Sequence, residues 1–227
     1  MTGRPVRVKI CGLTRAEDAR TAADAGADYL GVILTAGFGR SVSVDEAARV
    51  LDGVGPARVA VVVDEAPDVV ARAARAIGAG VVQLHGSEDR AMISELRGLG
   101  GWTIWKAVRA RTEDDIRLAV QGLCDLVDGF VIEGWREGVI GGGGVRVSVG
   151  GPAVRAAIPS ERTFALAGGL SPDNVGGAVA RFSPDVVDVS SGVEGAPGIK
   201  DPILVQAFVR AATGAIVDAS TTTTSSD

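Results

Sequence analysis

Eight short runs rich in valine and isoleucine alternate along this chain with alanine-rich, charged segments, and this alternation constrains the fold more than any other feature. Each run has the length of a buried parallel strand and is too short for an average helix. Alternating strands and helices imply parallel strands joined by right-handed crossovers. The predicted strands are Val6–Ile10, Tyr29–Leu34, Arg58–Val63, Val81–Leu84, Thr103–Val108, Leu126–Ile132, Thr163–Ala167 and Val186–Val189.

The segments between these strands carry helix-start signals. Thr14 with Glu17 three residues later is a capping-box pattern, and Ser43 or Val44 opens the second segment. Pro67 suits the first turn of the third helix, because proline lacks an N–H that this turn does not need. Further starts are predicted at Ser87, Thr112, Ser171–Asn174 and Asp201.

Eight strands at roughly even spacing favour closure into a single (β/α)8 barrel, the TIM-barrel fold, and 227 residues are enough for one. The alternative is an open doubly wound sheet, which would place a G-x-G-x-x-G turn after the first strand. The sequence there, Cys11–Thr14, does not fit that turn. We therefore predict one barrel domain over residues 1–214. Residues 215–227 end in threonines and serines, and we predict a disordered tail because they have little to bury.

Composition and charge exclude several classes of protein. A formal net charge of −5 argues against a general nucleic-acid binder, which would present a basic face. No apolar run reaches the roughly 20 residues that span a bilayer, and no signal-peptide pattern is evident, so we expect no membrane partner. Two cysteines make no disulfide scaffold and favour the reducing cytoplasm. With one histidine, the chain cannot form a metal site that needs two.

Glycine and serine follow the last two predicted strands, where a barrel of this kind places its chemistry. Gly168 and Gly169 follow the seventh strand, and Ser190, Ser191 and Gly192 follow the eighth. Loops of this kind offer backbone N–H groups to a phosphate, and a short helix N-terminus would add a favourable dipole. Alternatively, the glycines only make tight turns. We predict a small phosphorylated substrate at this end of the barrel.

Four motifs stand in order along the chain with matching spacing: Lys9–Thr14, Gln83–Gly86, Ala167–Val175, and Asp188–Glu194 with Pro197–Asp201. Together they resemble the phosphoribosylanthranilate isomerase family, and the resemblance runs from about Val6 to about Arg210. It implies a (β/α)8 barrel of tryptophan biosynthesis that works without metal or organic cofactor. The implied reaction is an Amadori rearrangement, an aldose–ketose isomerisation of N-(5-phosphoribosyl)anthranilate to 1-(2-carboxyphenylamino)-1-deoxyribulose 5-phosphate.

This reaction needs one acid and one base on opposite sides of the sugar. By resemblance Cys11 is the base, although a lone cysteine is otherwise most simply a small buried apolar residue. A thiol with a pKa of ~8.5 needs a lowered pKa or a local activator. Lys9 lies two residues earlier on the strand, so it shares a face with Cys11 and could supply that help. Cys124 has no such setting and is interpreted as structural.

The resemblance also implies roles for residues on other strands. Arg40 matches the arginine that holds the anthranilate carboxylate, for which a guanidinium is well suited. His85 either contacts the substrate or orders its loop. Asp188 is expected to face inward near the site. Glu133 stands where the family has its acid, an aspartate, so the carboxyl group is displaced by about one methylene.

The chain departs further from the family after the second and sixth strands. Gly141–Val149 keeps the glycines of the family's loop, among them Gly142, which we expect at the phosphate, but loses its lysine, threonine and Phe-Asp-Trp. Ala36–Gly39 replaces a more polar stretch before Arg40. Three hypotheses follow: a divergent isomerase of this family, a paralogue acting on a different phosphorylated amino sugar in specialised metabolism, and a non-catalytic phosphosugar-binding barrel. A monomer is expected, since no exposed apolar stripe is evident.

Overall fold

Eight parallel strands close into a barrel in the computed structural model, in which we describe residues 5–134 and 149–219, the last five as backbone only. Each strand pairs with the next along the chain, and the first pairs with the last through Lys9 opposite Asp188. The predicted (β/α)8 barrel is confirmed and the open doubly wound sheet is wrong. The strands are β1 (Arg7–Ile10), β2 (Tyr29–Ile33), β3 (Ala57–Val62), β4 (Val81–Leu84), β5 (Thr103–Ala110), β6 (Gly129–Gly134), β7 (Thr163–Leu166) and β8 (Val186–Val189).

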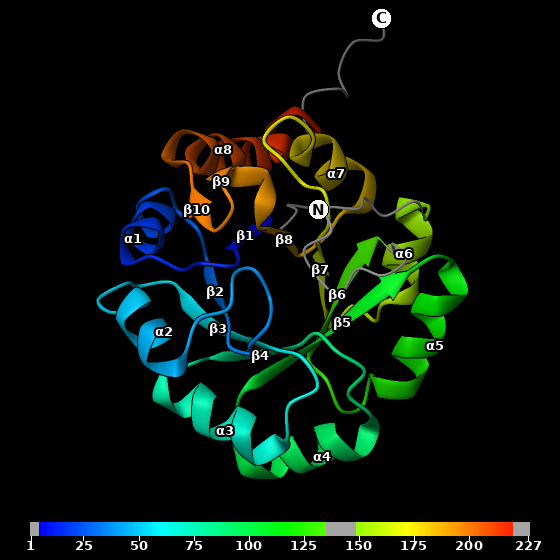
Figure 1. Ribbon diagram of the computed structural model, residues 1–227. Coiled ribbons are helices and arrows are strands. Elements are labelled where there is room, and N and C mark those ends of the chain that lie inside the picture. The colour runs from blue at the N-terminus through cyan, green and yellow to red at the C-terminus, as the bar shows by residue number, and fades with distance from the viewer. Residues whose placement is uncertain (1–4, 135–148, 220–227) are drawn as a thin grey trace, which may run out of the picture.

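The helices form a ring outside the barrel (Figure 1). Ser43 and Thr112 cap their helices as predicted, each in a capping box, and Pro67 begins the third helix. The helices are α1 (Ala16–Asp24), α2 (Val44–Val50), α3 (Pro67–Ala76), α4 (Arg90–Leu99), α5 (Glu113–Leu123), α6 (Gly151–Ala157), α7 (Val175–Phe182) and α8 (Pro202–Ala219).

Two predicted helix starts are wrong. Helix α1 begins at Ala16, and the Thr14 hydroxyl donates instead to the carbonyl of Gly198, 2.7 Å away. Helix α4 is capped by Asp89, whose carboxylate accepts from the backbone N–H of Met92, rather than by Ser87. The Thr14 hydroxyl is therefore used in a tertiary contact, and Ser87 lies in the preceding loop, where its backbone N–H donates to the Asp64 carboxylate.

The start of the sixth strand also differs from prediction, because Asp128 serves the neighbouring strand. Its carboxylate accepts from the backbone N–H of Ile104 at 2.7 Å, and β6 begins only at Gly129. Helix α8 continues to Ala219, so it includes the first residues of the segment expected to be disordered. The domain boundary at residue 214 and the disorder of residues 220–227 stay predictions.

Apolar side chains fill both sides of the barrel wall. The larger cluster lies between the strands and the helices, and a smaller one lies inside the barrel, where Tyr29 and Trp105 meet edge to face at 5.0 Å. Farther along the same strands the inward positions become polar, because Gln83 follows Val81 and Glu133 follows Val131 at spacings of two. The apolar layer therefore closes one end of the barrel and supports a polar group at the other.

The chain between β8 and α8 makes a small hairpin instead of a helix. A three-residue 3₁₀ turn, η1 (Ser191–Val193), leads into β9 (Glu194–Ala196), which pairs with β10 (Ile199–Lys200). The helix dipole expected to assist phosphate binding is therefore reduced to this single turn. Among the helices of the described residues, none is long and apolar enough to cross a bilayer.

Candidate active site

Polar side chains from β1, β4, β6 and β8 converge inside the barrel at the carboxyl ends of the strands. Lys9 is completely buried, and its ammonium lies 2.9 Å from a carboxylate oxygen of Asp188. Burial alone would lower the pKa of Lys9, but the Asp188 carboxylate and then Cys11 raise it above its ordinary value. Lys9 is therefore a fixed positive charge in the floor of the site.

The structure brings Cys11 next to this charge. Gly31 on β2 makes the arrangement possible, because a Cβ there would lie 2.9 Å from the Cys11 sulfur and 3.1 Å from the Lys9 ammonium. Burial raises the pKa of the Cys11 thiol, and Lys9 opposes that effect. Lys9 lies beside Cys11, as expected from their spacing on one strand face, but the net result is a raised thiol pKa rather than a lowered one.

His85 and Glu133 form the second polar group of the site. The Nε2 atom of His85 lies 3.2 Å from an oxygen of Glu133, and its Nδ1 atom lies 2.9 Å from the Gln83 amide nitrogen. Burial would raise the pKa of Glu133, but His85, followed by Arg109 and Lys9, lowers it below its ordinary value. In the free protein Glu133 is therefore a carboxylate in hydrogen-bonding contact with His85.

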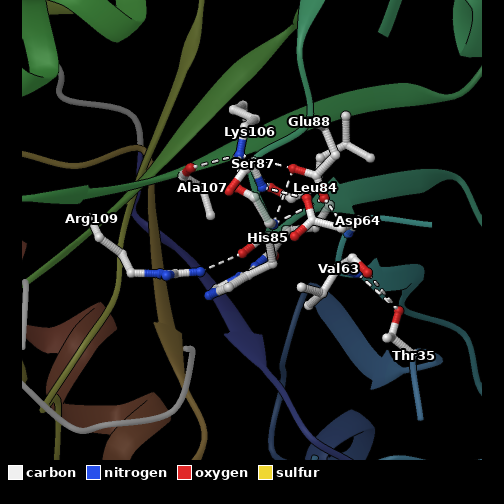
Figure 2. A network of polar contacts seen from close by, with 12 residues as sticks. Thr35, Val63, Asp64, Leu84, His85, Ser87, Glu88, Lys106, Ala107 and Arg109 are labelled. Carbon is white, nitrogen blue, oxygen red and sulfur yellow. Dashed lines mark hydrogen bonds and ion pairs between the residues drawn. The ribbon is translucent and has the colours of Figure 1, made fainter. Parts of the chain in front are cut away.

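A network of buried charges supports the loop that carries His85 (Figure 2). The Lys106 ammonium lies 3.0 Å from Glu88 and donates to the carbonyl of Gly86, while Glu88 accepts from the Gly86 N–H at 2.9 Å. Arg109 donates to the carbonyl of His85 at 2.7 Å. The backbone on both sides of the His85–Gly86 peptide is therefore fixed by charged side chains.

These supporting residues were not predicted from the sequence, although one signal was present. Lys106 interrupts the predicted apolar strand Thr103–Val108, and a buried lysine requires a partner. That partner is Glu88, which the sequence pattern assigned to the first turn of a helix beginning after Ser87. Gly86 is required for packing as well, because a Cβ there would overlap the Asp64 carboxylate.

Arg40 packs against Gly12, the residue after Cys11, and is paired with a carboxylate of the chain. Its Nε and Nη2 atoms donate to the two oxygens of Glu194, each at 2.7 Å, and Lys200 donates to the same carboxylate at 2.8 Å. Glu194 and Lys200 fall within the motifs quoted above, but no role was predicted for them. Their pairing across the β9–β10 hairpin joins them to Arg40.

The loops predicted to bind phosphate lie side by side. Gly168 and Gly169 both have positive φ angles, 88° and 62°, which suit glycine. Gly192 packs directly on the carbonyl of Leu170, where a Cβ would overlap it, so the loops after β7 and β8 are in contact. Gly142 lies outside the described residues. In residues 5–134 and 149–214 no group of three or more His, Cys, Asp or Glu side chains could hold a metal ion.

Comparison with known proteins decides the family. The family model described as N-(5'phosphoribosyl)anthranilate (PRA) isomerase matches residues 8–211. The chain belongs to the PRA isomerase family. Among curated PRA isomerases, that of Chromohalobacter salexigens is 41% identical over 207 residues, covering 89% of this chain and 92% of the relative. That of Trichlorobacter lovleyi is 36% identical over 214 residues, covering 93% and 100%.

Solved PRA isomerase structures share the whole architecture. The enzyme of Thermotoga maritima superposes with a TM-score of 0.81 at 31% identity, covering 92% of this chain and 99% of that one. A second PRA isomerase structure, in complex with reduced 1-(o-carboxyphenylamino)-1-deoxyribulose 5-phosphate, gives a TM-score of 0.78 at 31% identity and the same coverage. The chain therefore spans the PRA isomerase barrel from end to end.

Proposed function

We propose that this barrel catalyses the Amadori rearrangement of N-(5-phosphoribosyl)anthranilate, with Cys11 as the base and Glu133 as the acid. The observation that supports the proposal is that a thiol directly after β1 and a carboxyl group on β6 both lie at the carboxyl ends of the strands, each beside a charged or hydrogen-bonding side chain. Lys9 lies beside the Cys11 thiol, and His85 is in hydrogen-bonding contact with the Glu133 carboxylate.

The substrate would lie with its phosphate at the loops after β7 and β8 and its anthranilate carboxylate toward Arg40. Gly168, Gly169, Ser190, Ser191 and Gly192 would supply the phosphate contacts. Asp188 has one buried oxygen without a partner among the described residues, and it can accept from a hydroxyl of the sugar. These contacts hold the sugar between Cys11 and Glu133, which converts a solution reaction into a positioned one.

The reaction proceeds by two proton transfers. Protonated Glu133 donates to the furanose ring oxygen, the C1–O bond breaks, and an iminium forms between C1 and the anthranilate nitrogen. Cys11 as thiolate then takes the proton from C2, which leaves an enolamine that tautomerises to the ketone. Because the free Glu133 is a carboxylate, it must first take up a proton, and its contact with His85 gives that proton a route.

Loss of substrate fluorescence tests the proposal when phosphoribosylanthranilate is generated in situ. We expect turnover by the wild-type protein and a loss of at least ~100-fold in both Cys11→Ser and Glu133→Gln. Unchanged turnover in Glu133→Gln would refute the acid assignment. A wild-type protein that binds a product analogue without turnover would refute the proposal and leave the paralogue or the non-catalytic barrel.

We also infer that the protein acts as a monomer. The large exposed apolar side chains of the described residues are Val69, Leu118, Ile199 and Ile203, and each lies on a different element, which supports this inference. Light scattering of the purified protein tests it. A cytoplasmic location stays a prediction from cysteine usage.

A further inference from the structure

The guanidinium of Arg40 is used along only one of its two edges. Its side-on edge, Nε and Nη2, holds both oxygens of Glu194. A guanidinium has a second, end-on edge formed by Nη1 and Nη2, and it matches a carboxylate through two parallel hydrogen bonds. In the part of the chain that the structure describes, Nη1 of Arg40 has no partner.

The direction in which this free edge points is set by the close approach of Arg40 to Gly12. A Cβ at Gly12 would lie 2.6 Å from the Arg40 Cδ atom and 2.8 Å from the Ser190 hydroxyl. Arg40 therefore passes directly over the residue that follows the proposed base. Beyond Gly12, the two hydrogen bonds to the Glu194 carboxylate hold the guanidinium of Arg40 in place.

Glu194 is itself held rigidly by the β9–β10 hairpin. Lys200, opposite it in the hairpin, donates to Glu194 and, at 3.1 Å, to the carbonyl of Ser190. The hairpin is attached to the start of the barrel, because Asp18 accepts from the Lys200 N–H and Thr14 donates to Gly198. Glu194 is thus a carboxylate on a fixed support, and Lys200 links it to the phosphate loop.

Glu194 is a carboxylate between two cations, Arg40 and Lys200. Burial would raise the pKa of Glu194, but Arg40 and Lys200 lower it, so it stays a carboxylate. Without that carboxylate, the Arg40 guanidinium and the Lys200 ammonium would repel each other. With it, the cluster carries one net positive charge, which suits a single carboxylate of the substrate.

We propose that Glu194 is a positioning residue, which holds the side-on edge of Arg40 so that the end-on edge receives the anthranilate carboxylate. Lys200 ties this clamp to the phosphate loop and so fixes the distance between the two ends of the substrate site. The proposal rests on the proposed function, because it takes Arg40 as the group that binds the carboxylate.

Steady-state kinetics of Glu194→Gln test it. We expect KM for phosphoribosylanthranilate to rise about tenfold or more while kcat changes little, since uniform binding is lost. Inhibition by ribose 5-phosphate, which has the phosphate but no carboxylate, should change less than about twofold. Glu161→Gln, an exposed carboxylate before β7, is the matched control and should alter neither constant.

A double-mutant cycle shows whether Glu194 acts through Arg40. Arg40→Lys removes the planar fork, so adding Glu194→Gln to it should have no further effect on KM. If Glu194→Gln does not fold, Glu194→Asp serves instead, because the shorter carboxylate keeps its charge but cannot reach both cations.

Two results would overturn the inference, and they are distinguishable from failure of the proposed function. KM unchanged in Glu194→Gln, with Arg40→Lys raising it, would remove the positioning role alone. A lower KM in Glu194→Gln would mean that Glu194 competes with the substrate for Arg40. KM unchanged in Arg40→Lys would refute the carboxylate role of Arg40, and with it both proposals.

Discussion

Lys9 is the residue on which the charge balance of the site depends most. It is fully buried, it touches Asp188 at 2.9 Å, and it is the group that most opposes the effect of burial on Cys11. A buried ammonium of this kind is stable only with its carboxylate partner. Lys9 and Asp188 therefore both affect the pKa of the Cys11 thiol, and substitution of either residue should shift that pKa.

The first prediction concerns the pH dependence of the thiol. In the proposed mechanism Cys11 acts as a thiolate, so kcat/KM should rise with pH through the raised thiol pKa. Lys9→Met removes the cation that lowers this pKa and should move the rising limb to higher pH. Asp188→Asn removes a carboxylate that raises it and should move the limb to lower pH. Measured pH–rate profiles check both.

Opposite shifts in the two variants are the discriminating result. Cys124→Ser is the control and should leave the profile unchanged, because Cys124 caps the end of α5, which packs outside the barrel. Shifts in the same direction, or a limb that does not move, would mean that Cys11 is not the titrating base.

The second prediction concerns the length of the acid. Glu133→Asp shortens the side chain by one methylene, so its carboxyl group withdraws from His85, which now lies at 3.2 Å. We expect kcat to fall by about 10- to 100-fold, as a displacement of about 1 Å can cost, with less loss than in Glu133→Gln. Activity equal to the wild type would show that the extra methylene and the His85 contact are unimportant.

At the residue scale, the candidate residues could be named from the sequence, but the contacts that shift their pKa values could not. Cys11, Glu133 and Arg40 were located by their positions after predicted strands and by resemblance. The partners that tune them, His85 for Glu133 and Glu194 for Arg40, lie 48 and 154 residues away along the chain. No local pattern reports contacts across such separations, so those pairings required the structure.

At the scale of elements, the β4–α4 loop shows how buried charges hold the backbone around His85. Glu88 accepts hydrogen bonds from the backbone of Asp64 and Gly86 and pairs with Lys106. Burial would raise the pKa of Glu88, but Lys106 and then the backbone N–H of Asp64 lower it below its ordinary value. A folded carboxyl with a lowered pKa stabilises the protein above the pKa of the unfolded chain, and that contribution is lost as pH falls.

The third prediction follows from this buried pair. Glu88→Gln leaves the Lys106 ammonium without its carboxylate and should lower the free energy of unfolding by about 3–5 kcal/mol at pH 7. Urea unfolding of the wild type and the variant checks it. The difference should shrink as pH falls below the carboxyl pKa of the unfolded chain, about 4.3.

The double variant Lys106→Met with Glu88→Gln is the control for this pair. Because it removes both charges, it should recover part of the lost stability. If the double variant instead loses as much free energy of unfolding as the two single variants together, Glu88 and Lys106 do not act as a pair.

Helix starts illustrate when local sequence suffices for an element. Ser43 and Thr112 were predicted correctly because each caps its helix through a residue three positions on, Glu46 and Asp115. Thr14 has the same local pattern, but its hydroxyl is taken by Gly198, which lies 184 positions later in the chain. Capping signals are therefore reliable only where no tertiary partner competes for the side chain.

At the scale of the whole molecule, the two ends of the barrel have different roles. At the amino ends of the strands, Asp28, Asp128 and Asp185 accept from the backbone N–H groups of Val8, Ile104 and Phe164, at 2.7, 2.7 and 2.8 Å. Each carboxylate thus ties the start of one strand to the loop before the next. Residues at this end of such a barrel serve stability, and those at the other end serve chemistry.

The fourth prediction separates these two roles. Asp128→Asn weakens the contacts with Ile104 and Arg97 and should lower stability by about 1 kcal/mol. The values of kcat and KM should stay unchanged at a temperature where the variant is folded. Thermal unfolding together with steady-state kinetics checks this, and a loss of activity in the folded variant would contradict the division between the two ends.

The barrel itself was predictable because closure follows from a repeated local pattern. Eight buried runs with intervening helices leave few alternatives, and the missing glycine motif after Ile10 removed the main one. The hairpin Glu194–Lys200 was not predictable in the same way, because two short strands carry too little periodicity. That hairpin is where the structure adds most to the account of the site.

The most direct test of the central claim compares two amino sugars that differ in one carboxylate. The claim is that this barrel isomerises phosphoribosylanthranilate and recognises its carboxylate through Arg40. We predict a kcat/KM at least about 100-fold higher for phosphoribosylanthranilate than for N-(5-phosphoribosyl)aniline, because the analogue leaves a charged recognition group unpaired. Equal values, or a preference for the analogue, would contradict the claim and identify a barrel whose substrate is a different phosphorylated amino sugar.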